Sequence, residues 1–273
     1  MGGRADLHIH TYYSDGVLAP REVVSRARAR GLSAVAITDH DHTAGIAEAV
    51  TAGAGAGIEV IPGIELSATL AGEEVHILGY FVDPFHSALQ DFLGQIREER
   101  RKRARRIVEK LRGLNVPLEI DAVLEQAGAG SVGRPHIASA MVELGLTGSY
   151  QEAFVRFLGT GRPAYEDKFP VAAAEAIRVI RAAGGLSFVA HPGSSLRESA
   201  LLALIREGID GIEIIHPSHG PDLVRHYQGI ADEYYLLTSG GSDFHGGRRN
   251  DDDALGKHAI PLDRVEAMKR RLR

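Results

Sequence analysis

The chain has 273 residues, of which 44% are hydrophobic and 25% are charged, and its formal net charge is -5. This composition is ordinary for a globular protein with one large core, and the charge gives no overall attraction to nucleic acid or to an anionic membrane. Because the sequence contains no cysteine, disulfides, thiolate zinc sites and a cysteine nucleophile are excluded. The first residues form no apolar segment and no stretch is long enough to span a bilayer, so we expect a cytoplasmic protein with no membrane partner. No feature of the sequence indicates an obligatory protein partner.

Short apolar runs alternate with amphipathic segments along most of the chain. The stretch DLHIHTYYSDG at residues 6–16 begins as a strand pattern and continues into turn residues. A helix is expected after Pro20, followed by strands at 34–38, 58–65 and 75–82. After residue 170 the alternation resumes, with helices at 171–183, 196–207 and 222–232 and strands at 186–190, 211–215 and 235–238. This alternation predicts an α/β protein with a parallel sheet and crossover helices, most economically a (β/α) barrel.

Residues 86 to about 165 break this alternation, and we expect them to form consecutive helices, hence a helical insertion or cap. The helix expected at 88–113 carries the run REERRKRARR, which contains hardly any apolar residue. We interpret this run as a solvated face stabilised by charge pairs, because Glu98 and Glu99 lie inside it. The alternative is a basic edge that faces a nucleotide or RNA substrate.

Histidines and carboxylates recur where the expected strands end. His8 and His10 are two residues apart in a strand pattern, so their side chains share one face, although such a pair alone fits two structural histidines equally well. The loops that follow parallel strands converge on one rim of a barrel. Further candidates at this rim are Asp39, His40, Asp41, His42, Glu65, His191, Asp243 and His245, and His76 lies within the apolar run EVHILGY. Buried carboxylates and imidazoles are costly unless paired, so the set predicts a multinuclear metal site.

The motifs DLHIHT, TDHDH, AHP and SDFH, in this order, resemble the four motifs of the PHP (polymerase and histidinol phosphatase) phosphoesterases. The resemblance extends over nearly the whole chain and is greatest to the nucleotide-phosphoesterase branch. It implies a distorted seven-stranded (β/α) barrel formed by residues 1–85 and 166–273, with a helical cap at 86–165. It also implies removal of the 3′-phosphate from nucleoside 3′,5′-bisphosphates and, for some members, degradation of short RNAs from the 5′ end.

The resemblance implies a cluster of two or three divalent metal ions, with Mn, Fe or Zn as candidates and Mg as a further one. The implied first site is His8, His10 and Asp243; Glu65 bridges to a second site with His76 and His191; and the third site is Asp15, His40 and His245. Many histidinol phosphatases have histidine where this chain has Asp15. Asp6 lies on the same strand face, and we interpret it as orienting an imidazole, with a strand-start cap as the alternative.

The chemistry implied by these ligands is in-line attack on phosphorus by metal-activated water, without a covalent intermediate. The leaving 3′-oxygen requires a proton or a cation near it. Asp15, His40 and His245 are the candidate catalytic residues for this role, and the sequence does not discriminate among them.

Substrate contacts are expected in three short segments. In GRPHIA, Arg134 and His136 lie at a helix start, where a guanidinium and backbone N–H groups suit a phosphate. In GRPAYE, Arg162 and Tyr165 combine a cation with an aromatic ring that can stack on a base. In HPSH, His219 follows another expected strand. For each of these residues the alternative is an ordinary cap, turn or surface role.

Three other functions compete with the nucleotide phosphoesterase. Histidinol phosphatase is disfavoured by Asp15 and by the arginine-bearing cap, because histidinol phosphate has a cationic tail and one phosphate. An amidohydrolase is disfavoured because no lysine follows a strand and Glu65 takes the bridging position. A non-catalytic metal-binding PHP module is disfavoured because every expected ligand position is filled.

Overall fold

The computed structural model describes residues 2–193, 196–247 and 251–273. Its strands form one sheet in the order β7-β6-β5-β4-β3-β2-β1-β8. They are β1 (Arg4–Asp6), β2 (Ala34–Ile37), β3 (Glu59–Leu70), β4 (Glu73–Tyr80), β5 (Leu186–Val189), β6 (Gly211–Ile215), β7 (Leu237–Gly240) and β8 (Ile260–Pro261). The helices are α1 (Pro20–Ala29), α2 (Gly45–Ala56), α3 (Ser87–Gly113), α4 (Ile120–Ala127), α5 (Arg134–Glu143), α6 (Tyr150–Ala153), the π-helical turn η1 (Phe154–Leu158), α7 (Ala173–Ala182), α8 (Glu198–Arg206), α9 (Pro221–Glu233) and α10 (Leu262–Arg271).

The sheet curls into a nearly closed barrel. Strands β1, β2 and β3 pair in parallel, as do β5, β6 and β7. The seam is closed by the segment after β1, where the backbone N–H of Leu7 donates to the carbonyl oxygen of Gly240 (3.1 Å) and Ile9 forms a parallel bridge with Phe244. The expected α/β class and distorted barrel of the PHP type are therefore confirmed, although the described sheet has eight strands where seven were expected.

Two strands differ from the expected parallel pattern. The short strand β8 runs antiparallel to β1. Strand β4 runs antiparallel to both β3 and β5, because β3 and β4 form a hairpin. The hairpin turns through Ala71 and Gly72, whose φ angles of 51° and 85° fit the two-residue turn that joins twisted antiparallel strands. Glu65 was expected at the end of its strand, but β3 continues to Leu70, so Glu65 lies near the middle of a strand.

The first two histidines also lie differently from the expectation. Strand β1 ends at Asp6, and His8 and His10 belong to the extended segment that follows it. This segment stays in register with β2 because the backbone N–H of Thr38 donates to the carbonyl oxygen of Ile9 (2.9 Å). The two imidazoles therefore still share one side.

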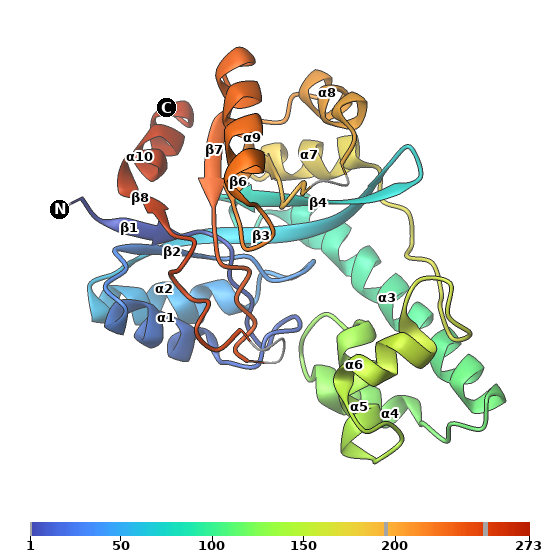
Figure 1. Ribbon diagram of the computed structural model, residues 1–273. Coiled ribbons are helices and arrows are strands. Elements are labelled where there is room, and N and C mark those ends of the chain that lie inside the picture. The colour runs from blue at the N-terminus through green and yellow to red at the C-terminus, as the bar shows by residue number, and fades with distance from the viewer. Residues whose placement is uncertain (1, 194–195, 248–250) are drawn as a thin grey trace.

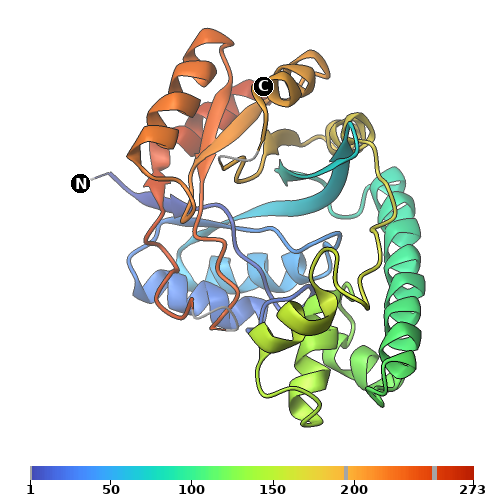
Figure 2. The same cartoon turned by 45° about the vertical axis from the view of Figure 1, so that its right-hand side comes forward.

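Helices α3 to η1 lie together on one side of the barrel, and we refer to them as the cap (Figures 1 and 2). Helix α3 has 27 residues and is about 40 Å long. Its first half contributes Leu89 and Leu93 to a core shared with α7, whereas its second half contributes Ile107 and Leu111 to a core built only from cap residues. The cap thus has its own hydrophobic core, joined to the barrel by one long helix. The boundaries at 86 and 165 stay a prediction.

Within the described residues, no helix combines the length and the apolar character needed to cross a membrane.

Candidate metal centre

Glu65 lies at the centre of a group of imidazoles. Its side chain is buried on β3, and its two oxygens face five histidines from four segments of the chain. The nitrogens nearest to Oε1 are Nδ1 of His76 (2.8 Å) and Nε2 of His191 (3.0 Å). Those nearest to Oε2 are Nδ1 of His40 (3.1 Å), Nε2 of His8 (3.3 Å) and Nε2 of His10 (3.3 Å).

Two further carboxylates flank this group. Asp243 Oδ1 lies 3.2 Å from Nε2 of His10 and 3.4 Å from Nε2 of His8. Asp15 Oδ1 lies 3.2 Å from Nε2 of His245 and 3.9 Å from Nε2 of His40. All nine residues expected as metal ligands therefore converge at one rim of the barrel.

The donor atoms of this group suit bound cations. Nε2 of His8, His10 and His245 and Nδ1 of His40 are buried and have no hydrogen-bond partner among the described residues. Leaving such atoms unsatisfied is costly unless something else binds them. The donor atoms of His8, His10 and Asp243 all lie within 4.8 Å of one another, and so do those of His10, Asp15, His40 and His245. A buried set of imidazole and carboxylate donors fits a divalent metal such as Zn, Mn or Fe.

The second implied site is divided differently from the expectation. The donor atoms of His8, Glu65 and His191 lie within 4.8 Å of one another. Those of His40, Glu65 and His76 form a separate group by the same distance. The rings of His76 and His191 are nevertheless neighbours, with centroids 5.2 Å apart. Glu65 is common to both groups, as a bridging ligand requires.

The electrostatics keep the carboxylates ionised. Burial alone would raise the pKa of Glu65, but His40, His76 and His8 outweigh burial and hold this pKa well below its usual value. Burial likewise opposes ionisation of Asp243, and His245 and His8 hold its pKa well below the usual range. Burial lowers the pKa of His40 well below 6.5, which keeps the imidazole neutral. Ionised carboxylates and, at His40, a neutral imidazole are the protonation states in which these groups bind metals.

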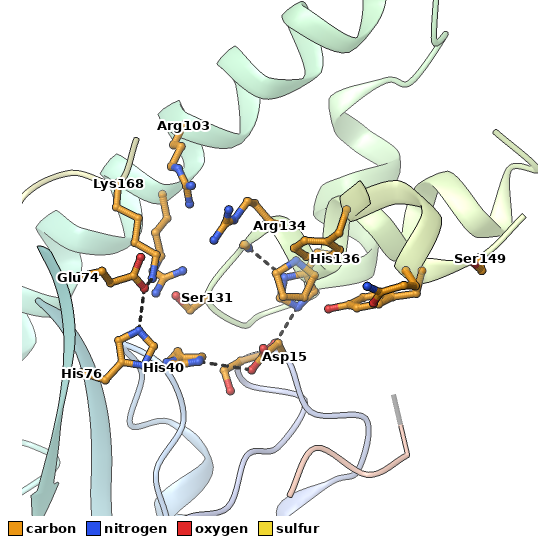
Figure 3. A pocket seen from close by; sticks show the side chains of 17 residues that line it. Asp15, His40, Glu74, His76, Arg103, Ser131, Arg134, His136, Ser149 and Lys168 are labelled. Atoms are coloured by element: carbon orange, nitrogen blue, oxygen red, sulfur yellow. Dashed lines mark hydrogen bonds and ion pairs between the residues drawn. The ribbon is translucent and has the colours of Figure 1, made fainter. Parts of the chain in front are cut away.

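A cavity of about 730 Å³ opens from this centre towards the cap, and we call it the cap cavity. Figure 3 shows Asp15, His40 and His76 on the barrel side and Arg103 and Arg134 on the cap side. Aromatic side chains of Tyr150 and Phe154 also line it. The cavity thus joins the ligand cluster to cationic and aromatic groups.

Comparison with known proteins identifies the family. A family model for the PHP domain matches residues 6–121. A 3′,5′-nucleoside bisphosphate phosphatase of Chromobacterium violaceum is 36% identical over 246 residues, which cover 88% of this chain and 86% of that protein. A 5′-3′ exoribonuclease of Haemophilus influenzae is 36% identical over 253 residues, which cover 90% of this chain and 91% of that protein. This chain belongs to the PHP family.

A solved structure agrees with this assignment. A protein of Bifidobacterium adolescentis, described as a metal-dependent phosphoesterase, superposes with a TM-score of 0.91 at 33% identity over 98% of this chain and 96% of that chain. The expected membership of the PHP family and the expected class of enzyme, a metal-dependent phosphoesterase, are confirmed.

The PHP centre contains a buried carboxylate that sequence reasoning missed. Glu213 on β6 is fully buried and accepts a hydrogen bond from Nδ1 of His8 at 2.9 Å. Its other oxygen accepts from the backbone N–H of His191 at 2.7 Å. Nε2 of His216, also missed, lies 3.8 Å from Asp243 Oδ2. The available signal was a glutamate inside the otherwise apolar strand GIEII.

Two aspartates near the PHP motifs hold backbone and hydroxyl groups. Asp39 accepts from the backbone N–H of Thr11 (2.7 Å), from its hydroxyl (2.6 Å) and from the hydroxyl of Ser14 (2.6 Å), which shapes the loop that carries Asp15. Asp6 accepts from the backbone N–H groups of Ser242 (2.9 Å) and Gly256 (2.7 Å). The interpretation of Asp6 as an orienting partner of an imidazole is therefore wrong, because it binds backbone N–H groups.

The basic run of α3 is only partly a solvated face. Arg100 and Arg103, three residues apart and therefore on one side of the helix, both line the cap cavity. Arg100 forms an ion pair with the buried Asp41, with Nε 2.7 Å from Oδ2. Arg101 and Lys102 point outwards and pair with Glu98 and Glu99. The interpretation of the whole run as solvated was thus wrong for its inward-facing residues.

Lys168 is a further cavity residue that was missed. It lies in the segment between the cap and α7, and it pairs with Glu74. Glu74 in turn lies 2.9 Å from Nε2 of His76, on the side of that ring away from Glu65. Burial opposes ionisation of Glu74, but His76 and Lys168 outweigh it and lower the pKa of this carboxyl. Glu65 and Glu74 on either side of the ring, with Lys168 holding Glu74, therefore fix the orientation of His76.

Of the five expected substrate contacts, Arg134 and His136 line the cap cavity. His136 already uses both ring nitrogens, since Nε2–H donates to the carbonyl oxygen of Ser14 (2.7 Å) and Nδ1 accepts from the N–H of Gly133 (3.0 Å). His219 does the same: Nδ1–H donates to the carbonyl oxygen of Ile214 (3.0 Å) and Nε2 accepts from the N–H of Gly193 (2.9 Å). Both rings tie loops together, and a direct substrate contact of either ring stays a prediction.

The pair expected in GRPAYE lies outside the lining of the cap cavity. Arg162 is exposed, and the ring of Tyr165 packs against the guanidinium of Arg134, whose central carbon lies 5.5 Å from the ring centroid. Tyr165 therefore supports Arg134, and the aromatic rings at the cavity are those of Tyr150 and Phe154.

Proposed function

We propose that this PHP-family phosphoesterase hydrolyses the 3′-phosphate of nucleoside 3′,5′-bisphosphates. The observation that carries the proposal is the cap cavity, which has metal-type ligands at one end and, at the other, two guanidiniums with no carboxylate partner among the described residues. A substrate with two phosphates separated by a nucleoside matches both ends. The name of the Chromobacterium violaceum relative supports the same substrate class.

The metal sites of this proposal use the nine converging ligands. His8, His10 and Asp243 would hold one ion, and Asp15, His40 and His245 another. His76 and His191 would hold a further ion through Glu65, which belongs to the donor groups of both histidines. We propose two or three ions of Mn, Fe or Zn, with Mg as an alternative. When bound, such ions lower the pKa of water and offset negative charge on the phosphoryl oxygens. Glu213 would orient His8, and Glu74 with Lys168 would orient His76.

Arg103 and Arg134 are the proposed site for the 5′-phosphate. Arg103 donates to the carbonyl oxygen of Glu166 from Nε (2.9 Å) and Nη2 (2.6 Å), and Arg134 donates to that of Leu158 (3.2 Å). Neither forms an ion pair within 4.0 Å with a carboxylate of the described residues. Burial and the charges of Arg134 and Arg100 lower the pKa of Arg103 to about 10. Two neighbouring cations that form no ion pair with a described carboxylate favour an anionic ligand between them.

The remaining cations of the cavity are less suited to this role. Arg100 is neutralised by Asp41, and Lys168 by Glu74. Arg100 would hold the cap against the barrel, and Lys168 would help to orient His76. Tyr150 and Phe154 offer aromatic faces for the base of the nucleotide.

At the leaving 3′-oxygen we propose Asp15, His40 or His245 as the group that holds or delivers the proton. Asp15 and His40 line the cap cavity, and His245 contacts Asp15. We also propose that residues 1–85 and 166–273 act as the metal-binding domain and residues 86–165 as the substrate-binding cap.

The direct test is hydrolysis of 3′-phosphoadenosine 5′-phosphate by the Mn-loaded protein. We expect inorganic phosphate and adenosine 5′-phosphate as products, loss of the activity with a chelator, and its recovery on adding Mn. Histidinol phosphate at equal concentration is the comparison substrate, and we expect it to react much more slowly, because its cationic amine would face Arg103 and Arg134. If the bisphosphate survives while histidinol phosphate is hydrolysed, the proposed substrate is wrong. If neither reacts, the alternative of a non-catalytic module is favoured.

A further inference from the structure

The cap lies directly on the loop that carries Asp15. The backbone N–H of Ser131 donates to the carbonyl oxygen of Tyr13 (2.9 Å). A Cβ atom at Gly130 would lie 2.8 Å from the carbonyl oxygen of Tyr13 and 2.9 Å from that of Tyr12, so only glycine allows the two backbones to approach this closely. The cap segment before α5 is therefore packed against the loop of Asp15.

His136 forms a further contact between the cap and this loop. The backbone N–H of Gly133 donates to Nδ1 (3.0 Å), so the proton of the neutral ring is on Nε2. Nε2–H donates to the carbonyl oxygen of Ser14 at 2.7 Å, and both residues are buried. Figure 3 shows the ring of His136 directed at the loop of Asp15. The start of α5 therefore sets the tautomer that the contact with Ser14 needs.

The carbonyl group of Ser14 is placed to control the position of Asp15. The peptide unit between the two residues is planar, so a hydrogen bond to this carbonyl oxygen restricts the position of the Asp15 Cα atom. Asp39 holds the same loop from the barrel side, since it accepts from the hydroxyl of Ser14 (2.6 Å). The donor group to which Asp15 belongs also contains His10, His40 and His245. One carboxylate of the metal centre is thus positioned from both the barrel and the cap.

We infer that His136 is a positioning residue of the metal centre, which acts through the carbonyl group of Ser14 on the metal ligand Asp15. The cap then completes a metal site as well as binding the substrate. This inference rests on the proposed function, in which Asp15 holds an ion and Arg134 binds the 5′-phosphate. Because His136 and Arg134 both belong to the first turn of α5, one helix start serves both ends of the cap cavity.

Loss of a positioning residue and loss of a phosphate contact have different consequences. Loss of a contact to the 5′-phosphate, as expected for Arg134→Ala, weakens only the substrates that carry this phosphate. Loss of the correct position of Asp15 weakens metal binding and slows every substrate, because it acts where the 3′-phosphate is attacked. Adenosine 3′-phosphate, which lacks the 5′-phosphate, therefore discriminates between the two roles of His136.

The test compares His136→Gln with His136→Met, two variants with side chains of similar length. The glutamine amide can accept from the N–H of Gly133 and donate to Ser14, as the imidazole does, whereas methionine can do neither. Competition with a chromophoric chelator should show about 10- to 100-fold weaker binding of one of the Mn ions in His136→Met, and nearly wild-type binding in His136→Gln. In His136→Met, kcat should fall for both 3′-phosphoadenosine 5′-phosphate and adenosine 3′-phosphate, and more Mn should be needed for the half-maximal rate.

A second variant tests the same packing without a change to the ring. Gly130→Ala places a methyl group against the carbonyl oxygen of Tyr13 and should push the cap segment away from the loop of Asp15, so Mn binding should weaken in the same way. Gly94→Ala on α3 is the matched control, because the added methyl group has open space around it. This pair decides the question if His136→Met does not fold.

The outcomes separate this inference from the proposed function. If His136→Met keeps the wild-type affinity for Mn and loses activity only on the bisphosphate, the ring contacts the 5′-phosphate and the inference is wrong, while the proposed function stands. If His136→Gln binds Mn as weakly as His136→Met, the hydrogen bond to Ser14 is not the cause and the inference also fails. If the wild type leaves both nucleotides intact, the proposed function fails, whereas the Mn affinities of the variants still decide the role of His136.

Discussion

The Nδ1 atom of His8 lies 2.9 Å from Oε1 of Glu213, and both side chains are fully buried. This hydrogen bond leaves Nε2 of His8 directed at Glu65 and Asp243. We expect Glu213→Gln to keep the packing but to weaken metal binding about 10- to 100-fold, because a carboxylate raises the basicity of the histidine that it orients. Competition with a chromophoric chelator measures this change. Unaltered metal affinity in a folded Glu213→Gln protein would show that Glu213 has no part in the centre.

Arg103 and Arg134 should determine the preference for a second phosphate. We expect Arg103→Ala and Arg134→Ala each to lower kcat/KM for 3′-phosphoadenosine 5′-phosphate by about 10- to 100-fold, the range for a lost charge-assisted hydrogen bond. Adenosine 3′-phosphate, which lacks the 5′-phosphate, should be affected much less. Arg101→Ala on the same helix is the matched control, because that side chain is 59% exposed. Equal losses for both nucleotides would place the 5′-phosphate elsewhere.

The ion pair between Arg100 and Asp41 should hold the cap against the barrel. Arg100 also donates to the hydroxyl of Ser67 (3.1 Å), and Asp41 accepts from the backbone N–H of Ser67 (3.0 Å). We expect Arg100→Met to destabilise the protein by about 3 kcal/mol, because it leaves the buried carboxylate without its partner. Denaturant unfolding measures the change, with Arg101→Met as the control. A loss below about 0.5 kcal/mol, as is usual at exposed sites, would contradict this role.

The metal-free protein should lose stability as the pH rises above neutrality. Burial lowers the pKa of His10, but Asp243 and Glu65 outweigh it and raise this pKa to about 9. A group whose pKa is raised by folding stabilises fully below its unfolded value of 6.5 and loses that contribution as the pH rises to about 9. The lowered pKa of Glu65 acts in the opposite direction, since its contribution is lost in acid.

Scanning calorimetry of metal-free and Mn-loaded protein between pH 6.5 and about 9 checks this prediction. The Tm of the metal-free protein should fall across this range. The Mn-loaded protein should show a smaller decrease, because bound metal takes the place of the protons. A metal-free Tm that stays constant or rises would mean that His10 is not charged in the folded apoprotein.

The metal centre was largely predictable from the sequence because its ligands lie in short local motifs. His8 and His10 share one extended segment, and Asp243 and His245 share another, so their convergence required only the barrel topology. The orienting residue Glu213 was not predictable in this way, since its role depends on which face of β6 meets His8.

The residues of the cap were less predictable for the same physical reason. The inward direction of Arg100 and Arg103 depends on how α3 rotates against the barrel, which the charge pattern REERRKRARR does not reveal.

The antiparallel course of β4 follows from the two-residue turn at Ala71 and Gly72, a weaker local signal than the alternation of strands and helices elsewhere. The spacing of motifs in the sequence thus identified the metal ligands. The residues that support them depend on how the helices and strands pack, which the spacing does not show.

The most direct test of the central claim is the metal content of the purified protein after loading with Mn and removal of free ions. Inductively coupled plasma mass spectrometry should find two or three ions per chain in the wild type, and fewer in Glu65→Ala, which removes the carboxylate that faces five histidines. A folded wild-type protein that retains less than one ion per chain would contradict the account.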